Sequence, residues 1–175
     1  MRKLVLYTAL SLDGYLARPN HAIDWLPEND TGEDYGYTAF YDTIGAVVYG
    51  RNTYDFMRAQ GFYAYEGVPN YLFSSAYSGD LPPNVLHVNQ PLAAVVGPLL
   101  QQEGKNIWLV GGSGLIREAL EAQLLAELHL QTIPVLIGQG ISLWLPRSGD
   151  VRLVLRSYTA YPDGVVATVY GCVYG

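Results

Sequence analysis

The sequence predicts an α/β fold with a mixed central sheet, parallel in its first part and antiparallel at its end. Two observations lead to this prediction. Short runs of β-forming residues alternate with segments of helical periodicity over most of the chain, and two strand-like runs then follow each other directly at the end. The 175 residues are enough for one domain with its own core, so we expect a single domain over residues 1–175.

The expected strands are short runs of β-branched, aromatic and other apolar residues bounded by turn residues. They cover residues 3–10, 46–49, 70–73, 85–88, 107–110, 127–133, 151–158 and 165–173. Residues 11–17 leave the first strand as a loop, the acidic residues 28–34 form another loop, and residues 134–140 are a turn-rich crossing. Pro162-Asp163-Gly164 is typical of a hairpin turn between the last two strands.

The expected helices are segments in which apolar residues recur every three or four positions. They start from residues 34, 50, 92 and 115, and the apolar patterns of the first, third and fourth continue to residues 44, 100 and 124. Gly45 is expected to end the first helix. Gly97-Pro98 lies inside the third pattern and favours a kink or a late start there.

Composition and charge exclude several classes of function. The net charge is −6 and the ten basic residues are scattered singly, which disfavours nucleic acid as a partner. No apolar run is long enough to span a membrane, and there is no sign of an export signal, so we expect a cytoplasmic protein. Cys172 is the only cysteine, which excludes an internal disulfide and a cysteine-rich zinc site, and we expect no metal.

A glycine-rich turn, Gly111-Gly112-Ser113-Gly114, stands between the strand 107–110 and the fourth helix. Glycines let the backbone approach a ligand without a Cβ in the way, and the start of a helix presents free N–H groups and the positive end of its dipole. This arrangement is typical of an anion site, such as one for the pyrophosphate of a nicotinamide dinucleotide. A plain connection between strand and helix would show the same residues.

Three junctions between a strand and the following turn share small or hydroxyl residues. They are Gly50-Arg51-Asn52-Thr53, Phe73-Ser74-Ser75 and Gly111-Gly112-Ser113-Gly114. If the strands are neighbours, these junctions converge beyond the strands' carboxyl ends, where open α/β sheets bind ligands. Arg51 would supply positive charge for a phosphate, and Ser74 and Ser75 hydroxyl donors. Each residue alone is compatible with a surface salt bridge, a cap or a turn, but the three junctions together favour a ligand. The G-x-G-x-x-G spacing of ordinary dinucleotide-binding folds is absent after the first strand.

Four segments resemble motifs of the dihydrofolate reductase superfamily, in order and at fitting spacing. They are Ser-Leu-Asp-Gly-Tyr-Leu-Ala at 11–17, Gly-Arg-Asn-Thr-Tyr at 50–54, Leu-Val-Gly-Gly-Ser-Gly-Leu at 109–115 and Pro-Val-Leu-Ile-Gly-Gln-Gly at 134–140. The resemblance spans nearly the whole chain and is closest to stand-alone proteins similar to the reductase domain of the bifunctional riboflavin-biosynthesis deaminase/reductase. It implies a three-layer α/β/α fold around a mixed sheet, NADPH as hydride donor and often a homodimer.

The resemblance also implies which residues bind the cofactor. They are Ala9, Leu16, Ala17, Gly50, Arg51, Thr53, Ser74, Ser75, Val110, Gly111, Gly112, Ser113, Gly114 and Leu115. Arg51 and Thr53 would contact cofactor phosphates, and Ser74 and Ser75 would lie by the 2′-phosphate that distinguishes NADP from NAD. The residues from Gly111 to Leu115 would hold the pyrophosphate, with a cis peptide between the first two glycines.

The substrate side follows from the same resemblance. The loop from Leu16 to Leu26 would cover the nicotinamide. The residues expected in the substrate pocket are Trp25, Tyr37, Tyr41 and Tyr54. Trp25 is equally compatible with a core position under that loop.

Two segments depart from the family's patterns. Alignment on Phe40 places Gly36 where dihydrofolate reductases carry an acid on the first helix, and Asp34 is nearby but shifted. Asp55-Phe56-Met57-Arg58 stands where riboflavin-pathway reductases usually carry a D-x-P-x-L-x-x-R segment for the ribose phosphate of the substrate. The zinc deaminase half of the bifunctional enzymes is absent, because the chain lacks its histidine and cysteine ligands.

These observations favour an NADPH-dependent reductase that acts on 5-amino-6-(5-phosphoribosylamino)uracil. The alternatives are reduction of dihydrofolate or of another small molecule, and a nucleotide-binding module without catalysis. Hydride transfer to a carbonyl or imine also needs a proton donor near the acceptor. The candidate donors, apart from a water molecule, are Asp13, Asp34, Tyr37 and Tyr41. Asp13 precedes a glycine, and an Asp in this position often stabilises the turn by a hydrogen bond from its side chain to the backbone.

Overall fold

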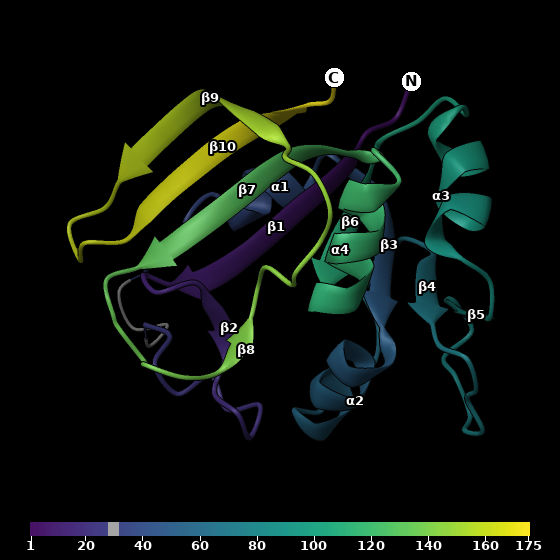
Figure 1. Ribbon diagram of the computed structural model, residues 1–175. Helices are drawn as coiled ribbons and strands as arrows, with labels where there is room; N and C mark the ends of the chain where they lie inside the picture. Colours follow the sequence, from purple (N-terminus) through teal and green to yellow (C-terminus); the bar gives the residue numbers. More distant parts are fainter. Residues whose placement is uncertain (28–31) are drawn as a thin grey trace.

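The computed structural model describes residues 1–27 and 32–175, so part of the acidic loop expected at residues 28–34 lies outside the described residues. The strands are β1 Leu4–Ser11, β2 Tyr15–Ala17, β3 Ile44–Gly50, β4 Asn70–Phe73, β5 Val85–Val88, β6 Asn106–Gly111, β7 Leu125–Ile133, β8 Ile141–Ser142, β9 Arg152–Ala160 and β10 Val166–Val173. The helices are α1 Tyr37–Tyr41, α2 Arg51–Ala59, α3 Leu92–Leu100 and α4 Ser113–Glu121 (Figure 1).

Eight of the described strands form one sheet, in the order β5-β4-β3-β6-β1-β7-β10-β9, and β2 and β8 form a small second sheet. All neighbours from β5 to β7 are parallel, whereas β10 is antiparallel to both β7 and β9. The mixed sheet predicted from the sequence is therefore confirmed. Because β4, β3 and β6 lie side by side, the three junctions that follow them come together at one end of the sheet (Figure 1).

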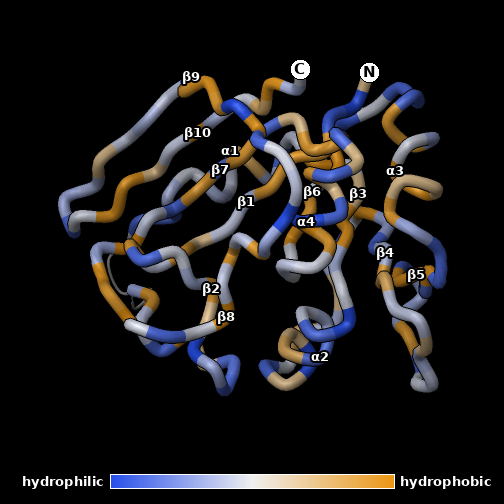
Figure 2. The backbone as a smooth tube through the Cα atoms, in the orientation of Figure 1, coloured by the Kyte–Doolittle hydropathy of each residue, from blue (hydrophilic) through white to orange (hydrophobic). Residues whose placement is uncertain are grey.

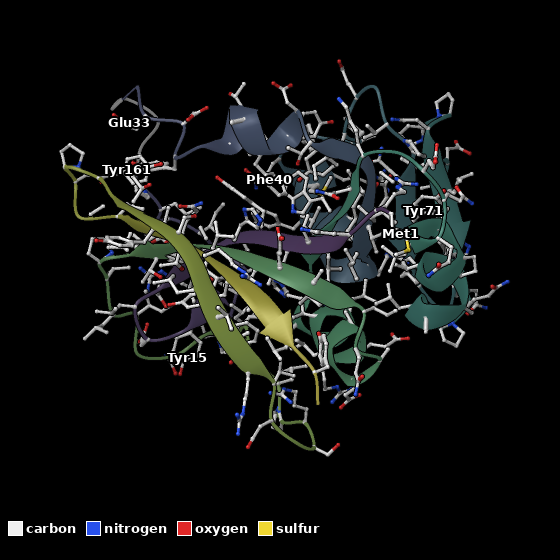
Figure 3. All side chains as sticks on the ribbon, turned by 90° about the horizontal axis from the view of Figure 1, so that it is seen from above. Met1, Tyr15, Glu33, Phe40, Tyr71 and Tyr161 are labelled. Carbon is white, nitrogen blue, oxygen red and sulfur yellow. The ribbon has the colours of Figure 1, made fainter. Side chains whose placement is uncertain are left out.

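Helices cover both faces of the large sheet, which confirms the three-layer arrangement. α3 and α4 pack against one face through residues such as Val96 and Ile116. α1 and α2 pack against the other face through Phe40 and Met57. Figure 3 shows Phe40 between α1 and the strands, when the molecule is seen from above.

β1 shows why the middle strands are apolar on both sides. Its side chains alternate, so that Leu4 and Leu6 belong to one core and Val5 to the other. A strand that is covered on both faces needs apolar residues at successive positions, which is the pattern of parallel sheets. Figure 2 shows hydrophobic residues gathered along the strands in the middle of the molecule, whereas many of the connecting segments are hydrophilic.

The loop expected at residues 11–17 is wrong in its last part, because residues 15–17 form β2, which pairs with β8. The two backbones come very close at this crossing. A Cβ on Gly140 would lie 2.2 Å from the carbonyl oxygen of Ala17, so only glycine lets the chain enter β8 here. The partner strand is distant along the sequence, and no local pattern reveals the pairing.

The expected boundaries of three helices also need correction. α1 ends at Tyr41, and Gly45 lies inside β3 rather than ending a helix. The apolar spacing of α1 continues beyond its end, because Ile44, the first residue of β3, is buried in the same core as Phe40. α3 begins directly after Pro91 and continues through its internal proline, so the late start is not observed. α4 ends at Glu121, and residue 124 lies beyond it.

No helix among the described residues is long and apolar enough to cross a membrane. In the same part of the chain, no three His, Cys, Asp or Glu side chains are grouped so that they could hold a metal ion.

Candidate functional site

A cavity of about 770 Å³ opens at the end of the sheet where β3 and β6 lead into α2 and α4. Its described lining comprises Thr8, Ala9, Leu16, Ala17, His21, Ile23, Leu26, Gly50, Arg51, Asn52, Thr53, Phe56, Met57, Tyr65, Val110, Gly111, Gly112, Ser113, Gly114, Leu115, Ile141 and Leu145. Every residue predicted to bind the cofactor belongs to this lining except Ser74 and Ser75. Two of the three junctions named above, those that begin at Gly50 and Gly111, therefore line the cavity, and the junction at Phe73 lies outside its described lining.

Two helices begin at this cavity. The N-cap of α2 is Gly50 and that of α4 is Gly112, both have extended backbones, and neither makes a side-chain cap hydrogen bond. The first N–H groups of a helix have no acceptor within the helix, and both first turns line the cavity. Two positive dipole ends and two sets of free N–H groups thus point to one place, which suits an anion with two negative groups. The sequence analysis recognised this property only for α4.

The turn between β6 and α4 exposes its backbone to the cavity, because Gly111 and Gly112 carry no side chains. The Gly111–Gly112 peptide is cis, as the resemblance implies, and Gly111 has a φ of 149°, which favours glycine. A Cβ on Gly111 would stand 3.5 Å from Thr53 Oγ1, and one on Gly112 would stand 3.7 Å from the same atom. Side chains at either position would fill the space beside the Thr53 hydroxyl, so glycine keeps this wall of the cavity open.

Arg51 lies at the edge of the cavity in several contacts. Its Nε donates to Asp55 Oδ2 at 2.6 Å, its Nη1 donates to the Ala76 carbonyl at 3.2 Å, and its guanidinium lies 4.9 Å from the ring centre of Tyr77. Ser74 Oγ donates to the same Ala76 carbonyl at 2.6 Å. Ser74 is therefore adjacent to Arg51 although it lies outside the cavity lining, and Ser75 beside it is exposed. Arg51 thus makes the surface ion pair and also faces the cavity.

Apolar and aromatic side chains also line the cavity. They are Ala9 of β1, Phe56 and Met57 of α2, Tyr65 after α2, and Ile23 and Leu26 of the loop after β2. The sequence analysis missed Phe56, Met57 and Tyr65 as lining residues. Phe56 and Met57 follow Thr53 by one helical turn, and this spacing could have indicated that they share its face of α2. Tyr65 follows α2 in a segment without regular structure, where no such spacing applies.

The predicted substrate residues lie elsewhere. Tyr54 is fully buried in the core, and its ring stacks on Tyr49 with the ring centroids 5.7 Å apart. The prediction that Tyr54 lines the pocket is therefore wrong, because α2 turns this side chain towards β3. Tyr37 and Tyr41 stack on each other outside the described lining and pack edge-on against Trp108. Trp25 is half-buried, and among the described residues its indole N–H finds no acceptor. It also lies outside the lining, although its loop contributes to the cavity.

The two aspartate candidates for proton donation have structural roles. Asp13 accepts hydrogen bonds from Ser11 Oγ at 2.6 Å and from the backbone N–H of Gly138 at 2.7 Å. Asp34 accepts from the backbone N–H groups of Gly36 and Thr38 at the start of α1. The Ser11 hydroxyl holds the pKa of Asp13 below its usual range, and the Thr38 side chain does the same for Asp34. Both are therefore carboxylates at neutral pH and have no proton to donate.

A cluster of aromatic rings surrounds Tyr7, which lies outside the described cavity lining. Tyr7, two residues before Ala9 on β1, stacks on Phe40 with centroids 4.4 Å apart and meets Trp108 edge-on at 6.1 Å. Its hydroxyl donates to the Tyr35 carbonyl at 3.3 Å. Burial raises the pKa of Tyr7 to about 12, so this hydroxyl keeps its proton. No motif marks Tyr7 in the sequence.

The fold is that of an α/β protein of the dihydrofolate reductase-like class. It has a mixed sheet in a three-layer arrangement and a glycine-lined cavity at the carboxyl ends of parallel strands. The chain belongs to the RibD C-terminal domain family, whose model matches residues 2–167. Most of its length is matched by a curated relative and by a solved structure, and it covers 95% and 99% of these two chains.

Three relatives illustrate this similarity. The uncharacterized protein YwjB of Bacillus subtilis (strain 168) is 32% identical over 165 residues, covering 94% of this chain and 95% of YwjB. A Shewanella sp. PV-4 protein assigned to riboflavin biosynthesis has a TM-score of 0.86 at 22% identity, covering 98% and 99% of the two chains. Dihydrofolate reductase from Enterococcus faecalis, in complex with NADP(H), has a TM-score of 0.69 at 15% identity, covering 97% and 96%. The two structural likenesses show the fold.

Proposed function

We propose that this protein is a reductase that uses NADPH to reduce a small molecule. The observation that carries the proposal is the meeting of two helix N-termini without side-chain caps, those of α2 and α4, in one cavity of about 770 Å³. Such N-termini bind phosphate groups, and a dinucleotide carries two of them in its pyrophosphate. Membership in the RibD C-terminal domain family and the likeness to a dihydrofolate reductase with bound NADP(H) support this proposal.

The residues of the cavity fit this cofactor. The bare backbone of Gly111 and Gly112 beside Thr53 leaves the room that a pyrophosphate needs. Arg51 would contact a phosphate from the first turn of α2, and Ser74, which shares the Ala76 carbonyl with Arg51, would lie on the side of the 2′-phosphate. Bound NADPH supplies a hydride, and the chain contributes binding, orientation and shielding.

The loop after β1 would shield the reaction from water. Leu16, Ile23 and Leu26 bring apolar side chains to the cavity. The Asp13 carboxylate binds the backbone of Gly138 and so joins the start of this loop to the segment that precedes β8. We propose that a water molecule supplies the proton, since Asp13 and Asp34 are ionised at neutral pH and the other two candidates, Tyr37 and Tyr41, lie outside the described cavity lining.

The first substrate to test is 5-amino-6-(5-phosphoribosylamino)uracil, because the motif resemblance and the family point to riboflavin biosynthesis. Dihydrofolate is a weaker candidate, since Gly36 occupies the position of the expected acid and the Asp34 carboxylate is engaged by the backbone N–H groups of Gly36 and Thr38. The experiment measures loss of reduced nicotinamide absorbance with each compound and with a panel of small carbonyls and imines. Turnover of any one supports a reductase and identifies its acceptor.

Binding of NADPH is tested separately, by energy transfer from the tryptophans to the reduced nicotinamide. We expect saturable binding with micromolar affinity and a weaker response to NADH. Absence of NADPH binding at millimolar concentration would remove the proposed cofactor. Binding without turnover of any compound would favour a nucleotide-binding module that has lost catalysis.

We also propose a homodimer formed through β9. Every residue of this strand is exposed, and the apolar Leu153 and Leu155 are 43% and 49% exposed. β9 is the edge strand of the large sheet and pairs with β10 alone among the described strands (Figure 1), and such edges are normally covered or charged. Light scattering should give twice the chain mass for the wild type and a monomer for Leu155→Arg. A monomeric wild type would contradict this proposal.

A further inference from the structure

We propose that a second cavity, between α4 and β9, binds a small carboxylate that carries an apolar group such as a single ring. The cavity has a volume of about 170 Å³ and lies beside the connection from β8 to β9, which Figure 1 shows passing α4. It is separate from the larger cavity of the proposed cofactor, and Leu145 is the one residue that the two described linings share. The proposed reductase reaction does not use it.

Much of the lining of this second cavity consists of buried apolar side chains. Ile116 and Leu120 come from α4, Leu128 from β7 and Leu143 from the connection between β8 and β9. All four are buried in the same hydrophobic core. Such a lining favours a ligand with an apolar body, because removal of apolar surface from water stabilises the complex.

The connection between β8 and β9 is held in place where it reaches the second cavity. Ser113 Oγ, at the start of α4, donates to the carbonyl of Ser142, and the N–H of Leu143 donates to the carbonyl of Gly14 at 3.0 Å. Trp144 follows immediately, lines the cavity and is half-exposed. A large aromatic side chain is therefore available at the cavity to pack against a bound ring.

The charged side chains of this lining are all positive. They are Arg117 of α4 and Arg147 of the connection, and the described lining contains no Asp or Glu. Neither arginine belongs to an ion pair among the described residues. Because the chain has only ten basic residues and a net charge of −6, two such arginines beside one cavity are a local exception. They favour an anion, since a guanidinium binds a carboxylate through charge-assisted hydrogen bonds.

The size of the second cavity limits which anion it can hold. Its volume of about 170 Å³ is far below the 770 Å³ or so of the larger cavity, so it cannot enclose a dinucleotide. Inorganic phosphate or sulfate would leave the apolar side chains without a contact. A monocarboxylate with one ring or a short branched chain matches the volume, the apolar lining and the two arginines together.

The test compares three probes on the full chain by isothermal titration calorimetry. 3-Phenylpropionate has both the charge and the ring, 3-phenylpropanamide has nearly the same shape without the charge, and acetate has the charge without the ring. We expect 3-phenylpropionate to bind about tenfold more tightly than the amide, the range for one hydrogen bond to a charged group. Acetate should bind more weakly than 3-phenylpropionate, because it leaves the apolar lining uncovered.

Substitution of the two arginines tests their role in the second cavity. Arg117→Gln and Arg147→Gln should each weaken binding of 3-phenylpropionate by about threefold or more, and together they should abolish its advantage over the amide. Unchanged binding of the amide would show that the cavity is intact. Arg152→Gln is the matched control, because Arg152 begins β9 next to the lining residue Leu153 but is absent from the described lining. It should keep the preference for 3-phenylpropionate.

The position of the bound probe is checked in two ways. 3-Phenylpropionate should change the tryptophan fluorescence of the wild type, and Trp144→Phe should lose this change while calorimetry still detects binding. Saturating NADP⁺ should not displace the probe. Displacement by NADP⁺, or a fluorescence change that survives Trp144→Phe, would place the probe elsewhere and overturn the second site.

Three other results would also overturn the second site. They are equal binding of 3-phenylpropionate and its amide, no binding at millimolar concentration, and an equal loss of affinity in Arg152→Gln and in the two lining variants. None of these results bears on the proposed cofactor, because NADPH binding is measured separately. Conversely, failure of NADPH to bind would leave the comparison of the three probes unaffected.

Discussion

The N-caps of two helices, Gly50 and Gly112, lie next to each other: a Cβ on Gly50 would lie 3.7 Å from the backbone nitrogen of Gly112. The same position would be 3.6 Å from a methyl carbon of Leu115, in the first turn of α4. Both glycines belong to the surface that lines the cavity. This proximity relates the second and fourth helices, which are far apart in the sequence.

The first prediction concerns this surface. Gly112→Val should weaken NADPH binding by at least about tenfold, because the valine methyls would occupy the space beside Thr53 that the cofactor needs. Fluorescence energy transfer measures the dissociation constant, and circular dichroism reports whether the sheet is retained. Gly97→Ala in α3, where a Cβ meets nothing within 4 Å, is the matched control and should bind as the wild type does. Unchanged affinity in Gly112→Val would make the turn a plain connection.

The second prediction concerns cofactor choice. Arg51→Gln should weaken NADPH binding by about tenfold, since it removes charge-assisted hydrogen bonds to a cofactor phosphate. A smaller loss with NADH would assign Arg51 to the 2′-phosphate, which NADH lacks, and an equal loss would assign it to the pyrophosphate, which both cofactors carry. Arg58→Gln is the control, because Arg58 lies on the same helix, donates to Tyr77 Oη at 3.0 Å and is absent from the cavity lining. Equal losses in both variants would mean that Arg51 acts only through general surface charge.

The carboxylate next to Arg51 leads to a third prediction. Arg51 Nε lies 2.6 Å from Asp55 Oδ2, so Asp55 competes with any bound phosphate for the Arg51 guanidinium. Asp55→Asn should therefore tighten NADPH binding a few-fold. It should change the free energy of unfolding by less than about 1 kcal/mol, because exposed ion pairs contribute little. Titration of the variant with NADPH, together with urea unfolding, checks both parts. Weaker NADPH binding would instead show that Asp55 positions Arg51 for the phosphate.

A fourth prediction concerns Asn70, the fully buried first residue of β4. Its Nδ2 donates to the carbonyls of Tyr65 and Val68 at 2.8 Å each, and its Oδ1 accepts from the N–H of Tyr65 at 2.9 Å. Asn70→Ala should lower the free energy of unfolding by about 3 kcal/mol, since these groups would stay buried without partners. Asn84→Ala, which removes a half-buried amide bound to the same carbonyls, should cost less. Urea unfolding compares the two, and equal losses would contradict the role of Asn70.

The fifth prediction is a pH dependence that originates at His129. Burial lowers the pKa of His129 below its ordinary value of 6.5, although Glu127 Oε2 lies 3.4 Å from its Nε2. Below pH 6.5 the unfolded chain therefore binds more protons than the folded one. The free energy of unfolding should fall as the pH drops from that value to the folded pKa, and His129→Gln should lack this part of the slope. Identical slopes in both proteins would rule out His129 as its origin.

The order and type of most elements could be predicted from local residue patterns. The strand that precedes each glycine or serine junction was recognised because buried parallel strands are short apolar runs that end at turn residues. The end of α1 could not be located, because Ile44 continues its apolar spacing while already belonging to β3. β2 was missed because its partner is β8, and the close approach at Gly140 becomes visible only when the chain has folded.

The candidate site divides in the same way. The phosphate side depends on residues next to each other in the chain, such as Gly111, Gly112 and Arg51, and the sequence alone determined that these follow strands and precede helices. The apolar side depends on which strands become neighbours and on their register. Only the tertiary structure decided that Ala9 stands opposite Gln131, because hydrogen bonding between β1 and β7 joins segments that no local pattern connects. Tyr54 was misplaced for the same reason: the rotation of α2 against the sheet, and not its residue type, turned it into the core.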